Sequence, residues 1–257
     1  MYKYLLWLLK IGALLNIYFY IKSLNPPISD IDLNILLPAQ ILFIVSAYRC
    51  IFPVRYNDNI VLHNSFLSSI FFTRFLATFV EVAYIYQFSY ILRLINNSAY
   101  IIIDLLAWLM VLHVIISQFF VWVAIIYNRK KYYYFEELGW AIIFIYNTVS
   151  SLILYISFNL SQQYETLILL NLIFGIFYLP WQIMHLNTLK IRYDKNIIPL
   201  SVNWNTITTG LSRSIKLKNQ ASDKNSWGGL IGLTWMACYW ATIIPFWLYY
   251  IIYSFSL

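Results

Sequence analysis

The sequence predicts an all-α protein: a polytopic integral membrane bundle of seven transmembrane helices with one interfacial amphipathic helix. Two observations carry this prediction. The chain is 61% hydrophobic and only 11% charged, whereas soluble globular chains are about 45–50% apolar and about 25% charged. Its apolar residues also gather in runs of about 20 residues, which is the length that crosses a bilayer as a helix. The charged residues are too few to cover a water-soluble fold of this size.

Seven apolar runs are expected to span the membrane. Their approximate ranges are 4–21, 32–49, 71–95, 100–127, 137–158, 165–188 and 228–255. Strands of a membrane barrel are about 10 residues long and alternate in polarity. The run at 100–127 is much longer and almost uniformly apolar, so helices are predicted instead. The whole of residues 1–257 is predicted to form a single transmembrane domain.

The segments between the runs support this division. The third and fourth runs are separated only by the polar turn Asn96-Asn97-Ser98, which favours an antiparallel helical hairpin. The seventh run begins after two glycines, Gly228 and Gly229. In the longest loop, apolar residues recur at steps of 4, 3, 4 and 4, which places them on one helical face. They are Leu200, Trp204, Ile207, Leu211 and Ile215. Residues of about 201–216 are therefore predicted to form an amphipathic helix on the inner leaflet.

Basic residues predict the orientation. With seven spans, the N-terminus and three of the loops share one side, which holds 13 Lys and Arg residues against 2 on the other. The thirteen are Lys3, Arg49, Arg55, Arg129, Lys130, Lys131, Lys190, Arg192, Lys195, Arg213, Lys216, Lys218 and Lys224, and the two are Lys22 and Arg93. Because cytoplasmic loops carry the excess of Lys and Arg, the N-terminus is predicted to be cytoplasmic and the C-terminus to lie on the opposite side. The net charge of +7 thus indicates contact with the lipid bilayer rather than with nucleic acid.

Ionisable and amide side chains inside the spans mark a candidate site, because such groups are costly in a bilayer. Most of them fall in the half that is predicted to face the cytoplasm, which predicts a polar cavity open to that side. The candidate catalytic residues are Glu81, Glu136, Glu137 and His185. The candidate substrate-binding residues are Arg74, Gln118, Asn147 and Gln182. Carboxylates and an imidazole supply acid–base groups, and an arginine can hold an anionic group.

Structural roles are the alternative for the same residues. Arg74 and Glu81 are seven positions apart on one helix face and could form a bridge, and the Asn and Gln residues could tie helices together. Glu136 and Glu137 could simply favour the start of the fifth helix through its dipole. The sixth run carries a polar stripe at steps of 7, 4 and 3. It consists of Asn171, Tyr178, Gln182 and His185.

Several classes of protein do not fit. A retinal-binding protein needs a lysine in the seventh span, and residues 228–255 contain none. The three histidines, His63, His113 and His185, lack the spacing of zinc-binding motifs, so no metal site is predicted.

The sequence therefore predicts a membrane-embedded enzyme that acts on a lipid or other amphipathic substrate from the cytoplasmic side. The alternatives are a transporter or proton-coupled carrier of a small solute, and a non-catalytic membrane scaffold subunit. No inverted repeat and no matched pair of Gly/Pro-broken helices is visible, which weighs against a carrier.

Overall fold

The structure is a computed structural model that describes residues 2–25, 31–191 and 202–255. The chain divides into two compact units. Unit 1 comprises Met1–Val80, Ile125–Tyr127 and Ser201–Leu257, and unit 2 comprises Glu81–Ala124 and Asn128–Leu200. The prediction of a single domain stays a prediction, and each unit is described by itself.

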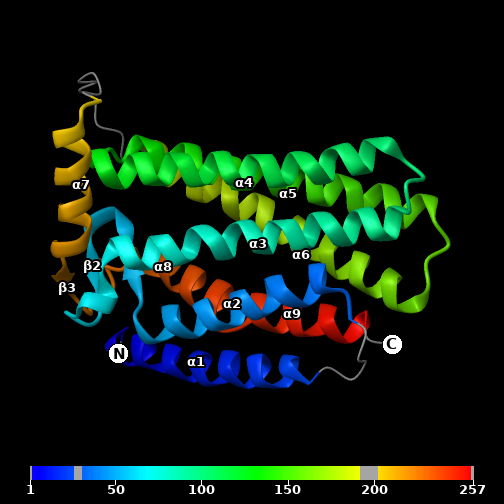
Figure 1. The fold of residues 1–257 in the computed structure, drawn as a ribbon, viewed down its shortest axis with the longest axis horizontal. Coiled ribbons are helices and arrows are strands. Elements are labelled where there is room, and N and C mark those ends of the chain that lie inside the picture. Colours follow the sequence, from blue (N-terminus) through cyan, green and yellow to red (C-terminus); the bar gives the residue numbers. More distant parts are fainter. Residues whose placement is uncertain (1, 26–30, 192–201, 256–257) are drawn as a thin grey trace. The chain divides into compact units, whose positions relative to one another are not determined.

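Helices make up almost all of the fold (Figure 1), which confirms the predicted all-α class. In the described residues, seven helical segments are long and apolar enough to cross a membrane, and they match the seven predicted runs. They are α1 (Tyr2–Leu24), α2 (Leu33–Ile51), α3 (Ile70–Asn96), α4 (Ile101–Tyr127), α5 (Lys131–Ser157), α6 (Gln162–Ile191) and the consecutive elements α8 (Gly229–Thr234), η3 (Trp235–Ala241) and α9 (Ile243–Ser254).

Two of these segments differ in detail from the prediction. The helix α5 begins at Lys131 rather than at 137, because a helix can include charged residues that a membrane span excludes. Glu136 and Glu137 therefore lie beyond the first turn, where the favourable effect of the helix dipole has faded. The last segment is not one regular helix: η3 is a π-helix, and at Thr242 the backbone leaves helical geometry.

In unit 1, the helices α1, α2 and α9 pack together with η3. The ring of Phe19 lies among the rings of Phe43, Phe246 and Tyr249, with centroids 5.7, 5.1 and 4.6 Å away. The Asn16 amide donates hydrogen bonds to the carbonyl oxygens of Gly12 (2.8 Å) and Trp240 (2.9 Å). The second of these bonds ties α1 to the irregular backbone of η3.

Unit 1 also contains a small sheet that the sequence did not predict. β1 (Val54–Arg55) pairs antiparallel with β2 (Ile60–Val61), which pairs parallel with β3 (Asn219–Gln220). Two short 3-10 helices, η1 (Tyr56–Asp58) and η2 (Phe66–Ser68), lie in the same stretch before α3. The sheet fixes this stretch against the loop that follows α7.

The predicted amphipathic helix is present as α7 (Trp204–Lys216), and position 201 lies outside the described residues. The side chain of Asn203 caps it by accepting a hydrogen bond from the backbone N–H of Thr206 at 2.8 Å. At its other end, the Arg213 guanidinium donates to the carbonyl oxygens of Ile125 (3.0 Å) and Ile126 (2.9 Å). The helix is thereby fixed to the C-terminal end of α4.

In unit 2, α5 packs along α6, and close approaches are made at glycines. A side chain at Gly139 would collide with Ser117 of α4, and one at Gly175 would collide with Thr148 of α5. The turn between α3 and α4 places Asn97 and Ser98 at positive φ, as the predicted hairpin requires. Each of these contacts brings helices together closely enough for polar side chains to meet between them.

The outer surface of several helices is more apolar than that of a water-soluble protein. On α4 and α6, large apolar side chains point outward: Ile101 is 86% exposed and Phe177 is 74% exposed. The buried polar side chains include Asn147 and Gln182, which are fully buried. Extended apolar outer faces of this kind indicate contact with another apolar medium.

Candidate functional site

One face of α6 carries three polar side chains of unit 2 that lie close together along the helix. Tyr178, Gln182 and His185 follow one another at steps of 4 and 3, so their side chains project from the same side of the helix. The same helix turns Phe177, Ile183 and Met184 outward, where each is more than half exposed. The helix is therefore polar toward the interior of unit 2 and apolar on its outer surface.

Glu137 of α5 meets this polar face through both of its carboxylate oxygens. The Gln182 amide donates to Oε2 at 2.8 Å and also to the main-chain oxygen of Glu137 at 2.7 Å. The other oxygen, Oε1, lies 3.5 Å from His185 Nε2, a distance that makes an ion pair when the imidazole is protonated. Both side chains are largely buried, with 14% exposure for His185 and 16% for Glu137. The carboxylate is thus held by an amide and lies beside an imidazole.

Three buried polar atoms beside this pair have no hydrogen-bond partner among the described residues. They are the Tyr178 hydroxyl, Gln182 Oε1 and His185 Nδ1. A buried polar group without a partner costs about 1–3 kcal/mol, and native proteins usually satisfy such a group with water or a ligand. Three such atoms on one helix face indicate a place for water or for the polar part of a ligand.

A second carboxylate lies between α3 and α4. The Gln118 amide of α4 donates to Glu81 Oε2 of α3 at 2.9 Å, and both side chains are buried, with exposures of 4% and 6%. Tyr178 lies within electrostatic range of both Glu81 and Glu137, and of Tyr84. The two carboxylate–glutamine pairs therefore approach the same tyrosine from different helices.

Aromatic rings fix the positions of the polar side chains. The indole of Trp181 stacks on the His185 imidazole, with centroids 5.5 Å apart and an interplanar angle of 10°. The ring of Phe144 packs against Tyr178 at 4.5 Å. The rings that pack against His185 and Tyr178 limit the rotation of both side chains, so the imidazole and the phenol are held in place before any ligand arrives.

Three other predicted site residues are Asn147, Arg74 and Glu136. Asn147 and Asn171 exchange two amide hydrogen bonds of 2.7 and 3.0 Å, and Asn171 also donates to Ser151 at 2.7 Å. Asn147 is ten residues beyond Glu137 on α5, or about 15 Å along the helix axis, and it ties α5 to α6. A role for it in binding substrate stays a prediction.

Arg74 and Glu136 are the other two. Arg74 belongs to unit 1, where its guanidinium lies 5.6 Å from the ring of Tyr56 and its side chain is 1% exposed. Glu136 is buried at 7% exposure on α5, about 100° around the helix from Glu137. Their predicted roles stay predictions.

Sequence reasoning did not include two residues of this cluster among the candidates, Tyr178 and Trp181. Tyr178 was recognisable by its spacing of four residues from Gln182, but tyrosines are frequent in this chain and are common at membrane interfaces. Trp181 gave no signal, because the stacking on His185 depends on side-chain rotamers. Among the described residues, no group of three or more His, Cys, Asp or Glu side chains could hold a metal ion.

Comparisons with protein-family models, with curated proteins and with solved structures found no match. The arrangement of the residues themselves is therefore the basis for the function proposed below.

Proposed function

We propose that this protein is a membrane-embedded enzyme that acts on a lipid or other amphipathic substrate, with His185 and Glu137 as its acid–base pair. The observation that carries the proposal is the imidazole of His185: one ring nitrogen lies 3.5 Å from the Glu137 carboxylate, and the other makes no hydrogen bond to any described residue. General acid–base catalysis uses a carboxylate beside an imidazole in many enzymes.

The chemistry follows from the positions of the atoms. His185 Nδ1 takes a proton from a hydroxyl group or a water molecule, and the Glu137 carboxylate stabilises the imidazolium that forms. The Tyr178 hydroxyl, buried and unpaired among the described residues, donates a hydrogen bond to oxygen that gains charge in the reaction. Hydrolysis or group transfer at an ester bond fits this set of groups: the activated oxygen bonds to the ester carbon, the bond to the leaving alkoxide breaks, and the imidazolium gives its proton to that alkoxide. Glu81, held by Gln118, supplies a second carboxylate near the phenol.

The surroundings favour an amphipathic substrate. The polar face of α6 lies on the same helix as the exposed side chains of Phe177, Ile183 and Met184. A lipid could therefore keep its acyl chains against the apolar outer face while its polar part reaches the acid–base pair. The positive-inside pattern of the sequence favours a cytoplasmic position, since Glu137 follows Arg129, Lys130 and Lys131 closely in the chain.

The test is a comparison of lipid composition before and after incubation with the purified protein in vesicles made from a mixed lipid extract. Mass spectrometry of the whole extract detects any product without prior choice of substrate. We expect the wild type to convert one lipid class and His185→Gln to be slower by about 100-fold or more, the usual contribution of a general base. Asn187→Gln, an exposed change on the same helix, is the matched control and should convert at the wild-type rate. A folded His185→Gln variant with undiminished conversion would refute the proposal.

A proton-coupled carrier is the second candidate, and the interrupted last segment favours it. Carriers often bind their solute where a membrane helix is broken, and the chain from α8 to α9 passes through a π-helix and a non-helical residue, Thr242. In sealed vesicles a carrier would move solute in response to an imposed pH gradient, and Glu137→Gln would abolish that movement. An enzyme would change the lipids without any such flux.

A further inference from the structure

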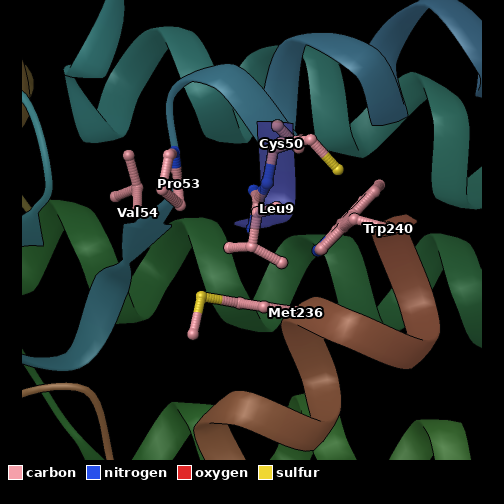
Figure 2. A pocket seen from close by; sticks show the side chains of 7 residues that line it. Leu9, Cys50, Pro53, Val54, Met236 and Trp240 are labelled. Atoms are coloured by element: carbon pink, nitrogen blue, oxygen red, sulfur yellow. The ribbon is translucent and has the colours of Figure 1, made fainter. Parts of the chain in front are cut away.

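Unit 1 contains a recess whose lining residues do not belong to the proposed acid–base site. It is lined by side chains from α1, α2, η3 and the start of β1, which Figure 2 shows from close by. Leu9, Met236 and Trp240 are among its apolar walls, and Arg49 is the one charged residue that lines it. Its walls include part of the π-helix, and π-helical turns occur frequently at functional sites.

The charge of Arg49 is buried, and no carboxylate in the described part of the chain compensates it. Its side chain is 7% exposed, and none of the described carboxylates forms an ion pair with it. The guanidinium lies between two aromatic rings, 5.1 Å from Tyr56 and 4.5 Å from Trp240. It donates one hydrogen bond to the Tyr56 hydroxyl, while its Nε has no partner among the described residues. A buried charge is costly unless it is paired, so this guanidinium is suited to an anion.

Two other cationic side chains of unit 1 contact residues near this recess. The guanidinium of Arg74 lies 5.6 Å from the same Tyr56 ring that Arg49 contacts. Lys10, the neighbour of Leu9 in the chain, places its ammonium 3.2 Å from the Ile51 carbonyl oxygen and 2.9 Å from His63 Nε2. Burial and the charge of Lys10 lower the pKa of His63, so the imidazole remains neutral and accepts from the ammonium.

We propose that this recess binds the phosphate group of an anionic membrane lipid, with the Arg49 guanidinium as the group that holds the phosphate oxygens. A guanidinium offers several N–H donors in one plane, which match phosphate oxygens. The apolar walls from Leu9 and Met236 suit the part of a lipid next to its head group. Free inorganic phosphate has the same oxyanion chemistry, and the experiment below separates the two sources. The site consists of residues of unit 1 and does not rest on the proposed acid–base pair.

Native mass spectrometry of the full chain in detergent tests this directly. We expect phosphatidylglycerol to bind at least tenfold more tightly than phosphatidylcholine, and inorganic phosphate at millimolar concentration not to displace it. Arg49→Gln should weaken phosphatidylglycerol binding about tenfold or more, the loss expected for charge-assisted hydrogen bonds. The matched control is Arg93→Gln in unit 2, because Arg93 is also a partly buried arginine over an aromatic ring, 4.1 Å from Trp108. That variant should bind like the wild type.

A second variant keeps the experiment decisive if Arg49→Gln fails to fold. Met236→Trp leaves the arginine intact but fills the recess, so it should also lose the preference for phosphatidylglycerol. Unchanged binding in whichever of these variants folds would overturn the proposal and leave Arg49 as a purely structural contact with two rings. Equal binding of the two phospholipids in the wild type would overturn it as well. Displacement of the lipid by inorganic phosphate would show that the recess takes free phosphate, against the lipid proposed here.

Discussion

The amide pair between α5 and α6 allows a quantitative test of how unit 2 is held together. Asn171→Ala removes three hydrogen bonds, two with Asn147 and one with Ser151. Interhelical hydrogen bonds in a membrane protein contribute about 0.6 kcal/mol each on average. The substitution should therefore lower the free energy of unfolding by about 2 kcal/mol. Asn171 is 3% exposed, so water does not replace the lost partners without rearrangement.

A double-mutant cycle separates the amide pair from the effect of the smaller side chain. The variants are Asn147→Ala, Asn171→Ala and the double substitution, each unfolded reversibly with SDS in mixed micelles. Two of the three bonds join the two asparagines, so the coupling energy should be about 1 kcal/mol. Asn187→Ala, on the exposed part of α6, should cost almost nothing. A coupling energy near zero would refute the interpretation of this pair as a tie between helices.

Three further predictions concern other contacts. Burial and the charge of Lys10 lower the pKa of His63, so the contribution of its neutral imidazole to stability is complete above the ordinary pKa of 6.5 and is lost as the pH falls below that value. The thermal midpoint of the wild type should therefore fall between pH 7.5 and 5, and that of His63→Gln should fall less. Equal falls in both proteins would contradict this role of His63. Arg213→Ala removes two hydrogen bonds to carbonyl oxygens of α4 and should cost about 1–2 kcal/mol; trypsin should then cleave faster near Lys216, and an unchanged cleavage rate would argue against the docking of α7. Gly139→Val forces a side chain into Ser117 and should destabilise by about 1–3 kcal/mol, measured by the same SDS titration; a neutral effect would mean that α4 and α5 are less closely packed there.

The helices could be predicted from the sequence because the signal is local. A membrane span needs about 20 apolar residues, and the run predicted at 165–188 is found as α6, Gln162–Ile191. The amphipathic face of α7 was visible for the same reason, since its apolar residues recur with helical spacing. Interruption of the last segment by η3 was not visible, because its composition is as apolar as that of a regular span.

The sheet could not be predicted because its strands have only two residues each. No periodic pattern exists in so short a strand, and β2 pairs with residues about 160 positions away in the chain.

The candidate site could likewise be predicted only where its contacts follow from spacing along one helix. The spacing along α6 predicted one shared face for Gln182 and His185, and both contact Glu137 as that face requires. That Gln118 is the hydrogen-bond partner of Glu81 could not be predicted, because this contact depends on how α3 packs against α4 and no local sequence pattern encodes that packing.

The proposed site for a bound molecule consists of Glu137, His185 and the Tyr178 hydroxyl, which has no hydrogen-bond partner among the described residues. The most direct measurement is mass spectrometry of what co-purifies with the wild-type protein and with its Glu137→Gln, His185→Gln and Tyr178→Phe variants. Asn187→Gln serves as the control. We expect one species that is bound by the wild type and the control and is lost, or reduced several-fold, in the other three. If the three folded variants retain the same species in the same amount as the wild type, the site does not exist as described.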